Sequence, residues 1–387
     1  MNEVLHERFV AMTDKTIQLA DFRAAWDQNR AGYLEAVERV GKSGWLILGQ
    51  EVEAFERDLS SFWGLRHAVG VANGLDALEI AFRCLGVTAG DRFLTTPLSA
   101  FATTLAVLRV GGIPEFVDVD ESGLIDLKLA RARLEDTTRP VRFFVPVHLY
   151  GQALPIVELE QIARDFGVEV VEDCAQAIGA MSDGKPVGSA SRCVATSFYP
   201  TKNLGAFGDG GALLTNDEGL SQLARSLRDY GQTDKYVHTT LGLNSRLDEL
   251  QAALLRSVQL PALAAQTERR RVIAGRYRDG LRNGRLTVPA APRGSASVWH
   301  LFPVIVDGER EAFRAHLKAH GVATGLHYPL LISAQLALRE AGHTLSPKGT
   351  FPIAERFADH EVSLPIHPFM TDEDCGRVVD ACNSWRP

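Results

Sequence analysis

The sequence predicts an α/β fold, with a mostly parallel sheet that carries helices on both faces and a smaller α/β domain after it. Three observations support this prediction. Short β-rich runs alternate with runs of helical periodicity through the first two thirds of the chain. The run 141–147 is apolar almost throughout, as expected for a strand covered on both faces. From about residue 288 a mixed helix and strand pattern indicates a second unit.

The elements of the first half follow in order. A helix is expected over 75–85, directly after Asn73-Gly74, because apolar residues recur there with helical spacing. We expect strands over 92–96, 113–119, 141–147 and 168–171, and a helix over 154–166. Repeated strand and helix units of this kind favour parallel pairing.

The second half begins with a glycine-rich segment. Glycines at 205, 208, 210 and 211 lead through tight turns into a strand over 212–215. A long helix is expected from about residue 245, with an interruption at Pro261 and an arginine-rich continuation that indicates a solvated helix face. We divide the chain into a large domain, 1–255, with an N-terminal helical segment, and a small domain, 256–387.

Composition excludes several classes of protein. Hydrophobic residues make up 45% and charged residues 23%, as in globular proteins, and a net charge of −7 argues against nucleic-acid or anionic-membrane partners. The five cysteines never form a C-x-x-C pair, which argues against a disulfide framework or zinc ribbon and suits a reducing cytoplasm. The N-terminal run is broken by charges, and no segment has the length of apolar residues that a membrane span requires.

Two familiar motifs fail on inspection. The tripeptide Gly41-Lys42-Ser43 resembles the end of a P-loop, but Ala36 stands where the earlier glycine is required. His316 and His320 have the i, i+4 spacing of zinc ligands, yet no third ligand is apparent. His320, just before a glycine, is better explained as a residue at a helix C-terminus. No metal site is predicted.

The residues that indicate chemistry lie in two segments, VVEDCAQ at 170–176 and SFYPTKN at 197–203. Asp173 follows a buried strand, at the sheet edge where open α/β sheets bind ligands, and a buried carboxylate there needs a cationic partner. Lys202 supplies one. Pyridoxal phosphate requires such a pair, because a lysine forms the Schiff base and an acid keeps the pyridine nitrogen protonated. The turn at 73–75, which opens a helix, offers backbone amides to the phosphate.

Spacing alone leaves simpler alternatives open. A lysine in this position is often a solvated residue near a helix end, and an acid after a strand is often a helix N-cap.

Segments spread over nearly the whole chain resemble the DegT/DnrJ/EryC1/StrS family of pyridoxal phosphate-dependent sugar aminotransferases. They are SGWLILGQEVEAFE at 43–56, HAVGVANGLDAL at 67–78, HLYGQ at 148–152, EDCAQAIGA at 172–180, SFYPTKNLGAFGDGGALLTND at 197–217, GLNSRLDELQAALL at 242–255 and HYP at 327–329. The resemblance implies the fold of fold-type I aminotransferases.

The resemblance also implies residue roles. Lys202 matches the Schiff-base lysine, Asp173 the partner of the pyridine nitrogen, and Gln176 the residue near the ring hydroxyl. Ser197 and the Gly74-Leu75 turn match phosphate contacts, although many members have threonine where Leu75 stands.

Two more positions match cofactor contacts, and four match the substrate side. Phe101 matches the aromatic residue that stacks on the ring, with an ordinary core role as the alternative. Asn244 matches an asparagine that reaches the phosphate from the other subunit. His327 and Tyr328 resemble a segment that lines the sugar side, where Tyr199 is also expected, and Lys235 suits a nucleotide diphosphate by charge. All four also fit ordinary structural or surface roles.

The activity that the resemblance implies is transfer of an amino group from glutamate to a nucleotide-linked keto-sugar, with a lean toward dTDP-3-keto-6-deoxyhexose. Alternatives are amination at C4, a cyclitol ketone, or a non-enzymatic cofactor-binding regulator. The dehydratase branch of the family lacks the lysine that this chain has at position 202. A cytoplasmic homodimer with composite active sites is expected. The resemblance does not determine which nucleotide the sugar carries, which sugar carbon receives the amino group, or whether glutamine replaces glutamate as the donor.

Overall fold

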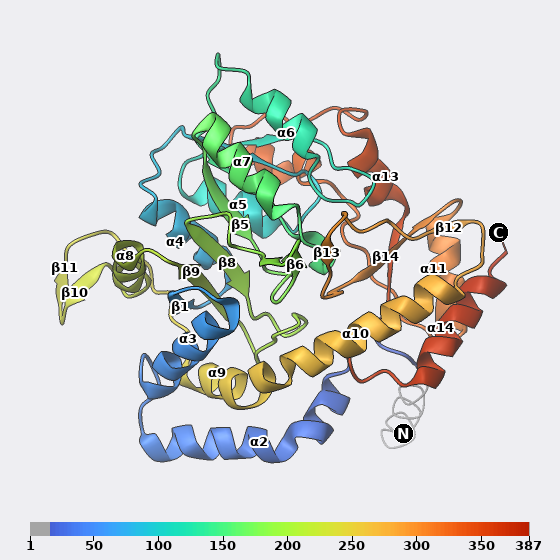
Figure 1. The fold of residues 1–387 in the computed structure, drawn as a ribbon, viewed down its shortest axis with the longest axis horizontal. Helices are drawn as coiled ribbons and strands as arrows, with labels where there is room; N and C mark the ends of the chain where they lie inside the picture. Colours follow the sequence, from blue (N-terminus) through green and yellow to red (C-terminus); the bar gives the residue numbers. More distant parts are fainter. Residues whose placement is uncertain (1–15, 387) are drawn as a thin grey trace.

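A seven-stranded sheet forms the centre of the computed structural model, which describes residues 16–386 (Figure 1). Its strands are β1 (His67–Val71), β2 (Arg92–Thr95), β3 (Ile113–Phe116), β4 (Phe143–Phe144), β5 (Glu169–Asp173), β8 (Cys193–Ser197) and β9 (Gly211–Thr215). They lie in the order β1-β9-β8-β5-β4-β2-β3. All neighbouring pairs are parallel except those that β9 makes with β1 and β8. The predicted mostly parallel sheet is confirmed.

Helices cover both faces of this sheet because successive strand residues point to opposite sides. Phe143 packs with one buried cluster and Phe144 with the other, and Val170 and Val171 divide in the same way. One cluster includes residues of α4 (Gly74–Cys84), α5 (Phe101–Arg109) and α8 (Glu218–Arg228). The other includes residues of α3 (Gln50–Trp63), α6 (Leu127–Leu134) and α7 (Ile156–Phe166). Burial on both faces explains the nearly continuous apolar run at 141–147.

Four predicted elements are shorter in the structure, of which β2 loses only residue 96 of the predicted 92–96. Strand β4 spans two residues of the predicted 141–147, since Pro146 has no amide hydrogen to donate to the ladder. Strand β3 ends at Phe116 instead of residue 119. Helix α7 begins at Ile156, after Pro155 as its N-cap, and not at residue 154.

The predicted interruption at Pro261 is wrong. Helix α9 (Glu249–Leu254) continues through a π-helical turn, η2 (Leu255–Gln259), into α10 (Leu260–Gly280). Pro261 lies in the first turn of α10, directly after the wide π turn, where a missing amide hydrogen is tolerated.

The solvated face predicted for the arginine-rich stretch is wrong for Arg270. Its buried guanidinium donates to the carbonyl oxygens of Trp299 and Ile366. Arg269 and Arg276 pair instead with Asp372 on α14 (Asp372–Ser384).

A smaller sheet of β12 (Leu286–Thr287), β14 (Phe302–Val306) and β15 (Glu361–Leu364) lies beyond α10 (Figure 1). Together with α11 (Arg310–Ala319) and α14 it encloses a separate core. Ile17, next to Val322, also belongs to that core. His320 is the C-cap of α11, as predicted. The boundary at residue 255 stays a prediction.

The remaining elements are short connections, apart from the long helix α2. They are α2 (Phe22–Ser43), η1 (Leu149–Gly151), β6 (Met181–Ser182), β7 (Lys185–Pro186), β10 (Gln232–Asp234), β11 (Val237–His238), β13 (Ser295–Ala296), η3 (Ile332–Ala334), α12 (Leu336–Glu340) and α13 (Pro352–His360). None of the helices within 16–386 has the length and apolar character to span a bilayer. All five cysteines are buried and unpaired. The N-terminal run judged unlike a secretion signal lies outside the described residues.

Candidate active site

The carboxyl ends of β1, β5 and β8 lie at one edge of the large sheet, and the two predicted segments meet there. Asp173 is the last residue of β5, so the strand extends further than the predicted 168–171. Ser197 ends the neighbouring strand β8, and Lys202 follows on the loop that leads to β9. Asn73 and Gly74 come directly after β1, at the start of α4. The fold thus places these residues at the edge where ligands bind in α/β sheets.

Two hydrogen bonds hold the buried Asp173 carboxylate. The hydroxyl of Thr103 donates to Oδ2 at 2.7 Å, and the amide of Ala175 donates to Oδ1 at 3.1 Å. Thr103 is in the first turn of α5, two residues after the predicted Phe101, which is half-buried. Sequence reasoning missed Thr103, although a hydroxyl residue that opens a helix at this edge was a usable signal.

Lys202 lies in an environment that favours its neutral amine. Burial lowers the pKa of Lys202 to about 8, and the nearby Asp173 carboxylate opposes that shift. At pH 7 about a tenth of the Lys202 amines are therefore unprotonated, far more than for an ordinary lysine, and the neutral amine is the nucleophilic form. Its backbone amide donates to the carbonyl of Tyr199 at 2.8 Å, which closes a tight turn in the loop.

The residue after the lysine anchors this loop to a distant segment. Asn203 is buried, and its Nδ2 donates to the carbonyl of Val298 at 2.9 Å. Its Oδ1 lies 3.2 Å from Nδ1 of His300 and accepts that proton. Burial, reinforced by the charge of Lys202, lowers the pKa of His300 well below its ordinary value, so the ring is neutral. This anchor was not predicted, because its two partners lie almost 100 residues further along the chain.

The N-terminus of α4 is closely packed against two other segments. The Asn73 side chain accepts from the amide of Asp76 at 2.8 Å, which leaves the amides of the first helical residues available. A Cβ atom on Gly74 would lie 2.7 Å from Cβ of Ser197, so only glycine allows this approach. Leu75 packs against the core, so its backbone alone serves the site. The geometry provides an anion-binding helix end beside a serine hydroxyl.

Gln176 connects the sheet edge to the predicted substrate segment. Its Oε1 accepts from the amide of Tyr150 at 2.8 Å, and its Nε2 donates to the hydroxyl of Tyr328 at 3.1 Å. The Tyr150 hydroxyl donates to the carbonyl of His327 at 2.6 Å. The structure therefore brings Gln176, His327 and Tyr328 together. Tyr150 was missed, because nothing in the HLYGQ segment sets it apart from a core residue.

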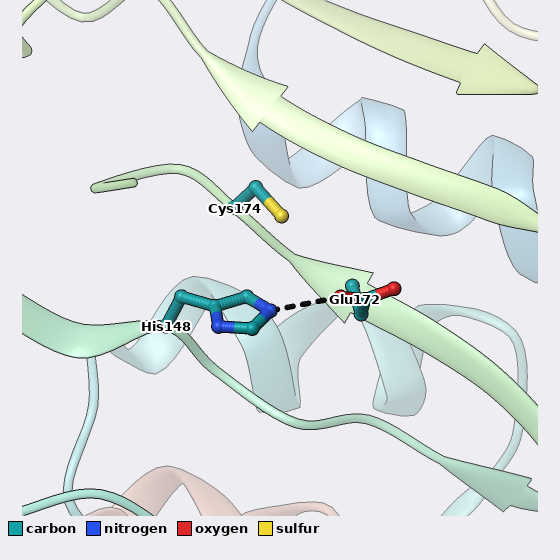
Figure 2. Close-up of side chains that lie close together, drawn as sticks. All are labelled: His148, Glu172 and Cys174. Carbon is teal, nitrogen blue, oxygen red and sulfur yellow. Dashed lines mark hydrogen bonds and ion pairs between the residues drawn. The ribbon is translucent and has the colours of Figure 1, made fainter. Parts of the chain in front are cut away.

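A second group of titratable side chains, His148, Glu172 and Cys174, lies within β5 and beside it (Figure 2). His148 Nδ1 accepts from the amide of Leu154, so Nε2 carries the proton and donates to Glu172 at 3.0 Å. Three further donors, from 188–191, satisfy the Glu172 carboxylate. Burial raises the pKa of Cys174 well above its ordinary value, which keeps it a thiol. His148 and Glu172 thus form a satisfied structural network, in which both ring nitrogens and both carboxylate oxygens have hydrogen-bond partners.

Three predicted residues have exposed side chains in the single chain, although the backbone amide of Tyr199 donates to the Ser197 hydroxyl at 3.2 Å. Tyr199 is 52% exposed, and Asn244 is also exposed. Lys235 is on the exposed hairpin β10–β11, which projects beyond α8 and away from β5 (Figure 1). Its ammonium lies over the ring of Tyr236, 5.4 Å from the centroid. Among the described residues, none of these three side chains forms a hydrogen bond or ion pair with Asp173.

Comparison with known proteins gives consistent matches over nearly the whole chain. The sequence model of the DegT/DnrJ/EryC1/StrS aminotransferase family matches residues 27–383. The dTDP-3-amino-3,4,6-trideoxy-alpha-D-glucose transaminase of Streptomyces venezuelae is 40% identical, covering 95% of this chain and 96% of that protein. The UDP-N-acetyl-3-dehydro-alpha-D-glucosamine 3-aminotransferase of Acidithiobacillus ferrooxidans is 37% identical, covering 95% and 98%. The crystal structure of S. venezuelae DesV in complex with a ketimine intermediate superposes with a TM-score of 0.90 at 40% identity, covering 96% and 98%.

Proposed function

Since this chain belongs to the DegT/DnrJ/EryC1/StrS aminotransferase family and is a pyridoxal phosphate-dependent transaminase, we propose that it transfers the amino group of glutamate to a nucleotide-linked keto-sugar. The preferred substrate is a dTDP-3-keto-6-deoxyhexose. Both relatives described above are named for amino groups at C3, one on a dTDP sugar and one on a UDP sugar. Amination at C4 and a cyclitol ketone are the alternatives.

The observation that carries this proposal is the placement of Lys202 and Asp173 at one sheet edge, beside the N-terminus of α4. The residues fit pyridoxal phosphate: an amine of lowered pKa, a buried carboxylate, and a helix end that Gly74 leaves open next to Ser197. When bound, the cofactor supplies a ring that accepts electrons.

The proposed roles follow from these contacts. Lys202 attaches to the cofactor and, once released, its Nζ takes and returns the proton of the reacting carbon. Asp173, fixed by Thr103, holds the ring nitrogen in its protonated form. Gln176 would contact the ring hydroxyl and Phe101 would pack against the ring face. Ser197 and the amides of 74–75 bind the phosphate.

The exposed predicted residues suit a second copy of the chain. Trp45 (61% exposed) and Leu46 are large apolar side chains on the surface, and the Leu46 carbonyl accepts from the amide of Glu249 on α9. Phe207 is exposed too and is bound to α9 through Gln251. Exposed large apolar side chains beside one helix suit an interface. We propose a homodimer in which Asn244 reaches the phosphate of the partner site and Lys235 meets the nucleotide diphosphate.

Two further assignments complete the proposal. The five unpaired cysteines support a reducing compartment, and we place the enzyme in the cytoplasm. The separate core beyond α10 supports two domains with a boundary near residue 255.

An amino-transfer assay tests the proposal. The holoenzyme is incubated with glutamate or glutamine and a panel of dTDP- and UDP-linked 3-keto and 4-keto sugars and a cyclitol ketone, and the products are identified by mass spectrometry. We expect the dTDP-3-keto-6-deoxyhexose, with glutamate, to give the highest kcat/KM. A holoenzyme that aminates none of the nucleotide sugars would overturn the proposal, and preference for the cyclitol ketone would select that alternative.

A further inference from the structure

A chain of three hydrogen bonds joins a buried carboxyl group to His327. Glu361 and Ser363 are two positions apart on β15, so they share one face of the strand, and both are buried. Glu361 Oε2 accepts from the amide of His327 at 2.7 Å, and its Oε1 is hydrogen-bonded to the Ser363 hydroxyl. That hydroxyl lies 2.9 Å from Nδ1 of His327. The carboxyl group is therefore connected to the imidazole through one serine.

The surroundings of Glu361 keep its carboxyl group protonated at neutral pH. Among the described residues no lysine or arginine forms an ion pair with it. Its charged neighbours, Arg310 and Arg314 of α11, both pair with Glu311. A buried carboxylate without an ion-pair partner is unfavourable. Burial accordingly raises the pKa of Glu361 to about 8, against the opposing effects of its hydrogen bonds and the two arginines.

Apart from Lys202, whose amine the proposed function joins to the cofactor in the holoenzyme, the other titratable groups around this chain do not change state near neutral pH. Tyr150 and Tyr328 face Glu361 from the two adjoining segments, and burial raises the pKa of each, that of Tyr328 to about 12. Burial, followed by the charge of Lys202, lowers the pKa of His327 to about 4. The imidazole is therefore neutral and has one proton to place. His300, whose ring is neutral, adds no charge.

The proton on Glu361 decides which imidazole nitrogen is protonated. A protonated carboxyl group donates to the Ser363 oxygen, so the hydroxyl donates to Nδ1 and the ring proton lies on Nε2. An ionised carboxylate accepts from Ser363, whose oxygen then accepts from Nδ1–H, and Nε2 becomes an acceptor. Nε2 itself has no hydrogen-bond partner among the described residues and is not buried.

We propose that Glu361 and Ser363 are positioning residues that fix the tautomer of His327, so that Nε2 is a hydrogen-bond donor to an oxygen atom of the sugar nucleotide. This inference rests on the proposed function, with His327 on the sugar side as the family resemblance implies. The contact of Tyr150 with the His327 carbonyl, and of Tyr328 with Gln176, holds this segment against the cofactor side of the site.

Neutron crystallography of the holoenzyme in heavy water tests the tautomer without any assay of activity. We expect deuterium on Nε2 of His327 near pH 7 and on Nδ1 well above pH 8. In Glu361→Gln the amide still donates to Ser363 and does not titrate, so deuterium should stay on Nε2 at both pH values. Deuterium on Nδ1 near pH 7 in the wild type, or the same change with pH in Glu361→Gln, would overturn the inference.

Kinetics of the two half-reactions test the role of Nε2. Ser363→Ala breaks the chain, and the kcat/KM of the sugar-nucleotide half-reaction, relative to that of the glutamate half-reaction, should fall about tenfold, as for one lost hydrogen bond. Ser182→Ala is the matched control, since this equally buried serine has no hydrogen-bond partner for its hydroxyl. If this ratio of kcat/KM values falls above pH 8 in the wild type, it should not fall in Glu361→Gln.

The outcomes separate the two proposals. The expected tautomer with no amination of any sugar nucleotide would overturn the proposed function and leave the hydrogen-bond chain intact. Amination of the sugar with an unchanged ratio in Ser363→Ala would overturn the inference alone.

Discussion

Two opposing influences act on Lys202 at the scale of single residues. Burial favours its neutral amine, and the Asp173 carboxylate favours the ammonium. The balance leaves a pKa of about 8, low enough for reaction and high enough for the released amine to carry a proton.

Replacing Lys202 with arginine should preserve the fold and abolish activity, because a guanidinium neither attaches to the cofactor nor exchanges a proton at neutral pH. Borohydride reduction and peptide mapping of the wild type should find the pyridoxyl mass on Lys202. Lys42→Arg, a surface change beside Glu38, is the control and should behave as wild type. A pyridoxyl label on another lysine would contradict this assignment.

Asp173→Asn should lower turnover by several orders of magnitude, because a neutral amide does not hold the ring nitrogen protonated. In the cofactor-free protein the same change should move the pKa of Lys202 below about 8, since the carboxylate that raises it is gone. The pH dependence of cofactor capture, followed by absorbance, measures this shift. Asp118→Asn alters an equally buried carboxylate that caps α13 and should leave that pKa unchanged. Near wild-type turnover in Asp173→Asn would reduce Asp173 to a structural residue.

At the scale of elements, the start of α4 is packed so closely that two glycine positions have no room for a Cβ atom. Glycine at position 74 allows Ser197 to approach the helix end, and Gly211 similarly has no room for a Cβ atom, which would lie 2.4 Å from the Asn73 carbonyl carbon. Three segments therefore meet without side chains between them, and the backbone amides remain accessible to an anion.

Gly74→Ala should weaken cofactor binding at least tenfold, because the new methyl group has to push the end of α4 away from Ser197. Gly275→Ala in α10 is the matched control: it too is a helical glycine, but with open space at its Cβ position. That change should stabilise the protein by up to about 1 kcal/mol. Cofactor titration and thermal melting of both variants measure the two effects. Wild-type affinity in Gly74→Ala would show that the phosphate-binding site does not lie at the start of α4.

Local patterns predicted the elements well where hydrophobic periodicity and glycine turns determine them, as in α4 and β9. They failed at Pro261, where a π turn accommodates the ring, and at Arg270, whose burial depends on carbonyl groups of distant segments. The pair of Lys202 and Asp173 was predictable because both lie beside strand ends. Thr103 was missed although its place in the first turn of a helix at this edge was a signal, and Glu361 was not predictable because its partners are set by tertiary packing.

At the scale of the whole molecule, the exposure of Asn244 and of the β10–β11 hairpin gives the proposed dimer a direct test. Lys202→Ala and Asn244→Asp should each be inactive, the second because a carboxylate repels the phosphate. In a mixed dimer one site combines both defects and the other is wild type. Reassembly should therefore restore up to about a quarter of wild-type activity, since about half the dimers are mixed and each has one good site. No gain over the separate variants, with subunit exchange confirmed independently, would place Asn244 outside the partner's site.

The anchor of Asn203 on Val298 and His300 has a consequence for the order of events during synthesis. All seven strands of the large sheet are complete once residue 215 has left the ribosome. Val298 and His300, whose carbonyl and imidazole hold the lysine loop, are translated much later. Because domains fold as units during translation, the growing chain passes through a stage with a finished sheet and an unfastened lysine loop. The cofactor is therefore expected to be captured only after the C-terminal part has emerged, which makes its attachment a late signal that the whole chain has folded.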